Sequence, residues 1–260
     1  MARSLIGGLC AQGVSPASIA TSDLSPECLQ AAAKFGVQTM SSNQDLVAQS
    51  DVVLLAVKPQ VMAEVVQGVA RQLAKRKPLL VSIAAGISCS SLLRWSAVPG
   101  LPIVRCMPNT PALLQCGATG LYASGDVSGR QRKLAEALLA AVGVALWVEK
   151  EGQLDAVTAV SGSGPAYFFL LMEHMQRVGE QLGLSKDVAR ELTVQTALGA
   201  ARMAQEAGDD VATLRANVTS PNGTTHAAIE SFMDNDFDKL VEQALSAAAR
   251  RSIALAEELG

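Results

Sequence analysis

The chain has 260 residues, of which 49% are hydrophobic and 17% charged, and its formal net charge at pH 7 is -3. This composition is typical of a globular protein that is long enough for one or two domains. Lysine and arginine are scattered along the chain and form no basic stripe, so we expect no nucleic-acid partner.

The sequence also argues against membranes, metals and disulfides. No apolar run reaches the length of a membrane span, and the first residues do not resemble a signal peptide, so we expect a cytoplasmic protein. Five cysteines, with no Cys-x-x-Cys pair among them, indicate free thiols. His174 and His226 are the only histidines, which is too few for a typical metal site or a His-based triad, and we predict no metal.

The first residues, MARSLIGGLCAQG, have the apolar spacing of a helix. A dinucleotide-binding domain normally places a strand and a Gly-x-Gly-x-x-Gly loop before its first helix, and neither is present. Gly7 and Gly8 fall inside the helical pattern instead. We therefore expect that Met1 is an internal methionine of a longer protein, or that the chain is truncated.

Short apolar runs and helical stretches then alternate up to about residue 148, as in βαβ units that build a parallel sheet. The expected strands are 51–57, 79–84, 103–106 and 145–148, and the clearest helices between them are 61–73 and 129–139. Another strand should end at Thr21-Ser22-Asp23. Asp23 could bond an NAD ribose, whereas Ser22 and Asn43 could accommodate the 2'-phosphate of NADPH, and we expect NADPH with NADH as the alternative.

Strand patterns stop after Glu149, and three helical segments follow at 165–182, 186–207 and from 225 onward. We therefore predict a dinucleotide-binding domain over 1–149 and an all-helical domain over 150–260. The first of these helices is apolar on nearly every face, and the second carries small residues at 197 and 199–201, which permit close helix packing. We expect a second copy of the chain to cover them in a homodimer; packing against the chain's own sheet domain is the alternative.

Candidate binding loops follow three of the expected strands: Lys58-Pro59, Ala85-Gly86 and residues 107–111. In an open parallel sheet, ligands bind beyond the carboxyl ends of the strands. Each loop alone could be an ordinary turn, but three of them on one edge favour a binding site.

Two more loops precede helices in the second half, at 161–165 (SGSGP) and 219–225 (TSPNGTT). Free amides at a helix N-terminus, together with hydroxyl groups, can bind an anion such as a carboxylate. Helix capping explains one hydroxyl but not several around one turn. No pair of carboxylates stands at a loop, which favours hydride transfer, because there the cofactor supplies the reacting atom.

At these same loops the chain resembles the pyrroline-5-carboxylate reductases. The segments SGSGPAYFFLLMEHM, QTALGAARM and LRANVTSPNGTTHAAIE resemble the signature regions of that family's helical domain, and LLAVKPQ and VRCMPNTPALLQCGATGLYA resemble loops of its cofactor domain. The resemblance covers the whole chain. One departure is Asn222, where the family often has glycine, but asparagine also tolerates positive φ.

The resemblance implies a Rossmann-type domain followed by an all-α dimerisation domain, which together reduce 1-pyrroline-5-carboxylate to proline with NAD(P)H. It implies that Thr225 is the catalytic residue, at the ring nitrogen of the substrate. The other substrate-binding residues would be Ser163, Ser220, Gly223 and Thr224. Dimers would assemble into rings, often decamers. The cofactor would contact Asn43, Ala56, Val57, Lys58, Pro59, Ala85, Asn109 and Thr110.

Two other interpretations remain open at this stage. A β-hydroxyacid dehydrogenase would carry a lysine and an asparagine on the helix after the glycine-rich loop, whereas residues 167–172 are apolar here. A non-catalytic dimeric paralogue, or an impaired truncated form, is favoured only by the missing glycine loop. A titration with NADPH would separate these forms from an active reductase.

Overall fold

The computed structural model describes all residues, 1–260, and divides into two compact units. The first comprises Met1–Pro165 together with Ala247–Gly260, and the second comprises Ala166–Ser246. None of the helices is both long enough and apolar enough to cross a membrane. The domain boundary predicted between residues 149 and 150 remains a prediction.

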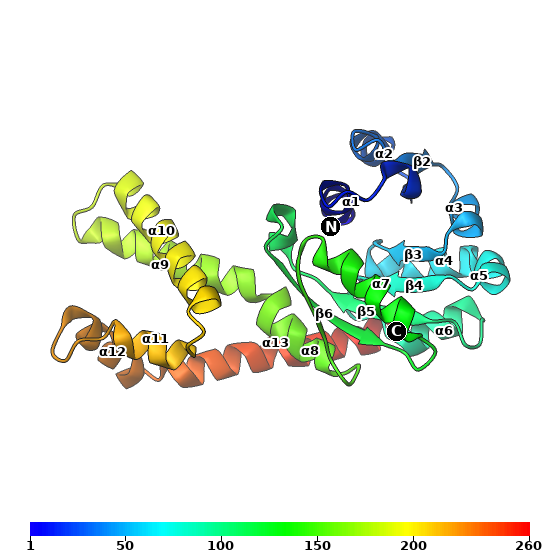
Figure 1. Ribbon diagram of the computed structural model, residues 1–260. Coiled ribbons are helices and arrows are strands. Elements are labelled where there is room, and N and C mark those ends of the chain that lie inside the picture. Colours follow the sequence, from blue (N-terminus) through cyan, green and yellow to red (C-terminus); the bar gives the residue numbers. More distant parts are fainter. The chain divides into compact units, whose positions relative to one another are not determined.

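The larger sheet of the first unit has five strands in the order β3-β4-β5-β6-β7 (Figure 1). Their bounds are β3 (Val52–Leu55), β4 (Leu79–Ser82), β5 (Ile103–Met107), β6 (Gly117–Ala123) and β7 (Gly143–Trp147). Strands β3, β4 and β5 are parallel, β6 is antiparallel to β5, and β7 is parallel to β6.

The predicted Rossmann-type parallel sheet is confirmed as a mainly parallel one, with a single antiparallel pairing at β6, a strand that the sequence did not predict. Its first residues, Gly117-Ala118-Thr119-Gly120, contain two glycines and no large apolar side chain, so the strand pattern is weak. Only the short 3-10 helix η3 (Thr110–Leu114) separates β5 from β6. A connection this short favours chain reversal, because a parallel pair needs a longer crossover.

A separate two-stranded parallel sheet joins β1 (Ala20–Ser22) to β2 (Gln38–Met40). Both α2 (Pro26–Ala33) and α3 (Asn43–Gln49) contact this sheet, α1 (Ala2–Ala11) contacts α2, and η1 (Pro16–Ser18) precedes β1. The helix predicted for the first residues is thus confirmed as α1. Strand β1 pairs only with β2, and β3 pairs only with β4, so each has one edge without a partner strand.

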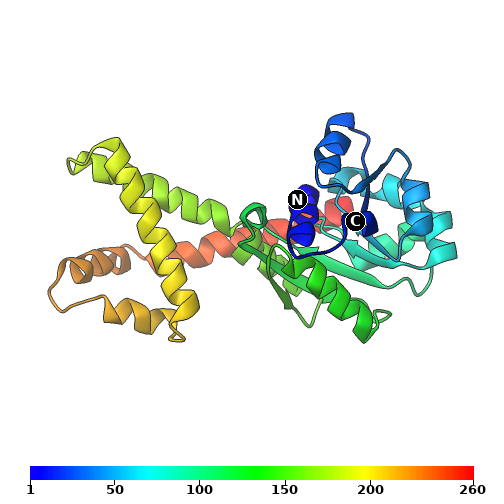
Figure 2. The same ribbon diagram turned by 45° about the horizontal axis from the view of Figure 1, so that its top comes forward.

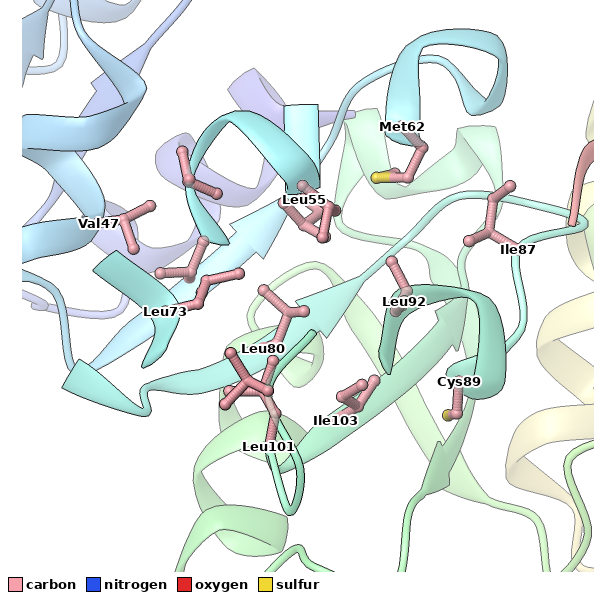
Figure 3. Packing of buried hydrophobic residues seen from close by; sticks show 14 of the residues in the cluster. Val47, Leu55, Met62, Leu73, Leu80, Ile87, Cys89, Leu92, Leu101 and Ile103 are labelled. Carbon is pink, nitrogen blue, oxygen red and sulfur yellow. The ribbon is translucent and has the colours of Figure 1, made fainter. Parts of the chain in front are cut away.

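Helices on both faces of the larger sheet form its core. Leu80 of β4 packs with α4 (Met62–Gly68), α5 (Ala70–Arg76) and α6 (Cys89–Ser96), as Figure 3 shows. Its neighbours Leu79 and Val81 pack on the opposite face with α1 and α7 (Gly129–Ala140). This alternation follows from the two-residue period of a strand, and burial on both faces explains the continuous apolar run.

The single helix predicted over 61–73 is wrong, because the structure has two. The 3-10 helix η2 (Pro59–Val61) leads into α4, and α5 begins after Val69, whose φ of -115° and ψ of 6° are not helical. Gly68 ends α4 directly before this break. Glycine is a poor helix former, and a pattern of apolar spacing alone does not register that cost.

The last residues of the chain, at the end of α13 (Phe237–Leu259), pack against other parts of the first unit. The hydroxyl of Ser252 donates to Asp155 on α8 (Gln153–Val157) at 2.7 Å. The backbone of Leu255 lies 3.4 Å from the position that a Cβ on Gly86 would take. Gly86 has a φ of +73°, and its lack of a side chain permits this close approach.

The second unit is helical: α9 (Gly164–Gln181), α10 (Lys186–Glu206), α11 (Val211–Asn217), α12 (Thr224–Asp234) and α13 (Phe237–Leu259). The first residues of α9 and the last of α13 belong to the first unit. Ser185 caps α10, because its side chain accepts a hydrogen bond from the amide of Val188. The helix expected from 225 onward is wrong as one element, because it breaks at Asn235 and at Asp236, whose φ is +57°.

Apolar side chains of α9 remain exposed within the helical unit. Phe168 is 64% exposed, Phe169 63% and Leu170 55%. Apolar residues of α10 are exposed too, including Leu192 and Leu198. Large exposed apolar patches mark interaction surfaces in soluble proteins. The surface therefore has the character that the sequence predicted for a dimer interface.

Candidate active site

Two neighbouring parallel strands carry most of the predicted cofactor-binding residues at their carboxyl ends. Ala56 and Val57 follow β3, and Ala85 follows β4; Leu55 and Ser82, near these ends, are paired in the register of the two strands. Ala56 and Lys58 are exposed, whereas Val57 and Pro59 are half-buried. The structure therefore brings these loops to one edge of the sheet, where ligands bind in open α/β sheets.

Asn109 has a structural role that the sequence did not predict. Its Nδ2 donates to the carbonyl of Ser161 at 3.0 Å, and its Oδ1 accepts from the amide of Ala118 at 2.9 Å. The residue is only 8% exposed. Because both ends of the amide group are already bonded within the protein, the side chain links β5, β6 and the 161–165 segment. Its predicted contact with the cofactor remains a prediction, and the neighbouring Thr110 is exposed.

The 161–165 segment packs directly on the end of β5. A Cβ added to Gly162 would lie 2.6 Å from the methyl carbon of Met107, which is closer than side-chain carbons approach. Gly162 ends a turn of π-helix (Thr158–Gly162), a conformation often found at functional sites. The segment carries the predicted substrate-binding residue Ser163, so this residue lies next to the predicted cofactor-binding loop of β5.

A pocket of about 200 Å³ opens in the first unit between the start of α1, the end of β1 and Ala56. Arg3, Thr21 and Asp23 supply its polar side chains. Met1 is the N-cap of α1, and its side chain makes no cap hydrogen bond. Asn43 does not line this pocket; it is half-buried at the start of α3.

These features fit part of a dinucleotide. A helix N-terminus suits a phosphate, and Thr21 and Asp23 at the end of β1 suit ribose hydroxyls. Sequence reasoning found the end of β1 but missed Arg3. The signal for Arg3 was present, since it is the one charged residue in the predicted first helix and lies in its first turn.

The second unit holds the 219–225 loop at the turn between α11 and α12 (Figure 2). Asn222 has a φ of +58°, which confirms the turn that Asn-Gly predicted. The amide of Gly223 donates to the carbonyl of Ser220 at 3.0 Å and closes the turn. Gly223 is the N-cap of α12 and has no side chain to bond the first-turn amides.

The N-terminus of α12 therefore presents unpaired donors in one place. The hydroxyl groups of Ser220, Thr224 and Thr225 make no hydrogen bond within the protein, and these three residues are exposed. In contrast, the hydroxyl of Thr219 donates to the carbonyl of Arg215 at 2.6 Å. Free amides, free hydroxyls and the positive end of the helix dipole suit a carboxylate.

Titratable side chains add little reactivity near these loops. Burial, and then the charge of Glu151, raise the pKa of the Cys89 thiol to about 12. Burial also raises the pKa of Cys106. Both thiols therefore remain protonated at neutral pH and are poor nucleophiles. His226 contacts Glu230 on its own helix, with 3.3 Å between Nδ1 and Oε2, and no group of side chains is arranged to hold a metal ion.

Comparison with known proteins covers both units. The family model described as pyrroline-5-carboxylate reductase dimerisation matches residues 151–255, and that described as NADP oxidoreductase coenzyme F420-dependent matches residues 1–86. The pyrroline-5-carboxylate reductase of Pseudomonas aeruginosa is 58% identical over 261 aligned residues, covering 100% of this chain and 95% of the relative.

Solved structures agree with this result. A pyrroline-5-carboxylate reductase from Coxiella burnetii has a TM-score of 0.95 at 42% identity, with 98% of this chain and 94% of that chain covered. The Plasmodium falciparum pyrroline carboxylate reductase, solved with NADP bound, has a TM-score of 0.84 at 28% identity, covering 97% of this chain and 93% of that one. Neither the dehydrogenase nor the non-catalytic interpretation gains support, and the chain belongs to the pyrroline-5-carboxylate reductase family.

Proposed function

We propose that the protein reduces 1-pyrroline-5-carboxylate to L-proline with NADPH, the last step of proline biosynthesis. The observation that carries this proposal is the 219–225 loop, which combines the free α12 amides with three unpaired hydroxyls in a member of the reductase family. The substrate is a cyclic imine that bears a carboxylate. It needs an anion site and a hydrogen-bond donor close together, and this loop supplies both.

The residues of the 219–225 loop have separate proposed roles in binding the substrate. The amides at the start of α12, with the hydroxyls of Ser220 and Thr224, hold the substrate carboxylate, and Gly223 keeps the approach to those amides open. The hydroxyl of Thr225 lies at the ring nitrogen and donates a hydrogen bond to it. Ser163 contributes a further hydroxyl. No strong general acid is required, because positioning supplies much of the rate enhancement.

The cofactor is held by the first unit. The residues that would contact it are Asn43, Ala56, Val57, Lys58, Pro59, Ala85, Asn109 and Thr110. When bound, NADPH supplies the hydride that the imine carbon accepts, while the ring nitrogen gains a proton. The protein's part is to orient the imine and to polarise its C=N bond through Thr225.

The assembly and location are also proposed. The helical unit forms a homodimer through the apolar surface of α9 and α10, and these dimers associate into a ring such as a decamer. Cross-linking and light scattering of the purified protein measure both stages. The reaction takes place in the cytoplasm, which cell fractionation tests.

Steady-state kinetics test the function directly. The purified protein is mixed with pyrroline-5-carboxylate and NADPH, NADPH loss is followed at 340 nm, and proline is measured independently. Thr225→Ala should reduce kcat by about 10- to 100-fold, whereas Thr225→Ser, which keeps the hydroxyl, should retain most of the activity. Full activity of Thr225→Ala would remove the catalytic role, and no proline from the unmodified protein would refute the function.

A further inference from the structure

Asn109 uses its side chain for distant contacts instead of capping the helix that it precedes. It is the N-cap of η3, yet its side chain makes no cap hydrogen bond. Its Oδ1 accepts from the amide of Ala118 in β6 at 2.9 Å, and its Nδ2 donates to the carbonyl of Ser161 at 3.0 Å. Asparagine is among the best N-cap residues, so the absence of this local bond indicates that the distant bonds decide the conformation of the side chain.

The carbonyl of Ser161 needs a donor from outside its own helix. The ordinary α-helical partner of that carbonyl is the amide four residues later, and Pro165, in the first turn of α9, has no N–H to donate. Immediately before this proline, the amide of Ser163 donates to the carbonyl of Thr158 at 2.8 Å and closes the turn of π-helix. The Nδ2 of Asn109 therefore supplies the hydrogen bond that the proline removes.

A second contact anchors the same segment on β6. Val157 ends α8, directly before the π-helical turn. A Cβ added to Gly120 of β6 would lie 2.7 Å from both methyl carbons of Val157. The glycine therefore lets Val157 pack directly on the strand. The turn is thus held at both ends, by Val157 at its start and by the hydrogen bond from Asn109 to Ser161 near its end.

Ser163, a predicted substrate-binding residue, is the first residue after this turn. It is half-buried, and its hydroxyl makes no hydrogen bond within the protein, unlike that of Ser161, which donates to the carbonyl of Val157 at 3.0 Å. The position of the Ser163 hydroxyl therefore depends on the backbone of the turn. Because a π-helical turn closes i→i+5 bonds where an α-helix closes i→i+4 bonds, its loss would change the direction in which the next side chain points.

We infer that Asn109 is a positioning residue for Ser163: through the carbonyl of Ser161 it holds the π-helical turn closed and so fixes the Ser163 hydroxyl as a substrate-binding group. A binding hydroxyl is effective only if the residues behind it lock its position. The inference rests on the proposed function for its substrate. The side chain of Asn109 acts here without touching a ligand, and a cofactor contact through its backbone is unaffected.

Three variants separate positioning from stability. Asn109→Asp keeps the size of the side chain and the acceptor for the amide of Ala118, but it replaces the donor to Ser161 with a carboxylate oxygen, which repels that carbonyl. Asn109→Ala removes both bonds without adding charge. Ser252→Ala is the matched control, because it breaks a buried hydrogen bond of similar length, 2.7 Å, between Ser252 and Asp155 of α8, which does not hold the π-helical turn.

Steady-state kinetics and a double-mutant cycle measure the role of Asn109. A hydrogen bond to a charged group typically changes affinity by about tenfold or more, so Ser163→Ala and both Asn109 variants should each raise the KM for pyrroline-5-carboxylate about tenfold, with kcat within about threefold. Combining Ser163→Ala with Asn109→Asp should leave KM raised about tenfold and not about a hundredfold, because both residues act through one hydroxyl. The Kd of NADPH for Asn109→Ala, measured by fluorescence without substrate, should change by less than about twofold, and Ser252→Ala should leave KM and Kd within about twofold.

Hydrogen exchange tests the structural part of the inference without the reaction. In both Asn109 variants the amide of Ser163 should exchange at least about tenfold faster, whereas Ser252→Ala should leave its exchange unchanged. The inference is overturned if that exchange is unchanged in the Asn109 variants, if the Kd of NADPH rises as much as KM, if the double variant raises KM about a hundredfold, or if Ser252→Ala reproduces the rise in KM. If the unmodified protein forms no proline but the exchange result holds, the proposed function fails while the positioning of Ser163 stands.

Discussion

The ion pair between Arg105 and Glu151 should stabilise the first unit more than any exposed pair does. Arg105 Nη1 lies 2.7 Å from Glu151 Oε1, and the two side chains are only 12% and 28% exposed. The same carboxylate oxygen accepts from the amide of Cys89 at 2.7 Å. Glu151 thereby joins β5, the start of α6 and the segment before α8. Its replacement by alanine would break all three connections.

The cost of Glu151→Ala follows from these contacts. Removing one partner of a fully buried pair costs about 3–5 kcal/mol, and an exposed pair contributes at most about 1 kcal/mol. Water can reach the partly exposed site and replace some of the lost bonds, so we place the loss in unfolding free energy at about 3 kcal/mol. Glu151→Gln keeps an acceptor oxygen and should cost about half as much.

Urea unfolding followed by tryptophan fluorescence measures this loss, because Trp95 and Trp147, the two tryptophans of the chain, both lie in the first unit. The matched control is Arg76→Met, which breaks the pair with Asp51. That pair has a shorter N–O distance, 2.6 Å, but its side chains are 44% and 88% exposed. If Glu151→Ala lowers the unfolding free energy no more than Arg76→Met does, the argument from burial is wrong.

Three further predictions concern thiols, glycines and the helical surface. Because the pKa values of Cys89 and Cys106 are raised above the ordinary value of 9.0, folding is favoured while both thiols are protonated. The unfolding free energy measured with urea should fall as pH rises above about 9, by about 1.4 kcal/mol per pH unit per thiol and less steeply in Cys89→Ala, and a flat profile would contradict this. Gly8→Ala should lower the unfolding free energy by about 2–3 kcal/mol, because its Cβ would lie 2.5 Å from a backbone oxygen. Gly7→Ala should lower it by less than about 1 kcal/mol, because its Cβ meets only the movable ring of Phe35, at 3.1 Å. Thermal or urea unfolding measures both losses, and equal losses would refute the reasoning. Phe169→Asp should convert dimer to monomer in light scattering, since the exposed ring would then be charged, and an unchanged mass would exclude this face as the interface.

Local chemistry explains which parts of the fold the sequence could predict. A turn with a specific residue requirement was recognisable: Asn222, which has a φ of +58°, turns the 219–225 loop. Strand β6 was missed because two of its first four residues are glycine and none of the four is large and apolar. Its direction depends on the short connection from β5, which no periodicity of side chains records.

The same contrast between local and distant contacts explains which parts of the functional sites could be predicted. The 219–225 loop was recognisable because one continuous segment contains all of its donors, so the sequence alone places them together. Asn109 was assigned to the cofactor from its position after a strand, yet its hydrogen bonds to Ser161 and Ala118 depend on segments 9 and 52 residues away. A polar residue in a loop cannot reveal, from sequence alone, whether a ligand or the protein satisfies it.

Cofactor selectivity is the property that sequence reasoning is least able to determine here. Asp23 alone favours NADH by the usual rule for its position, and the family's likeness to NADP-dependent proteins favours NADPH. The pocket brings Asp23 together with Arg3, which belongs to a different element and is 20 residues away in the chain, and no single segment of the sequence records that neighbourhood.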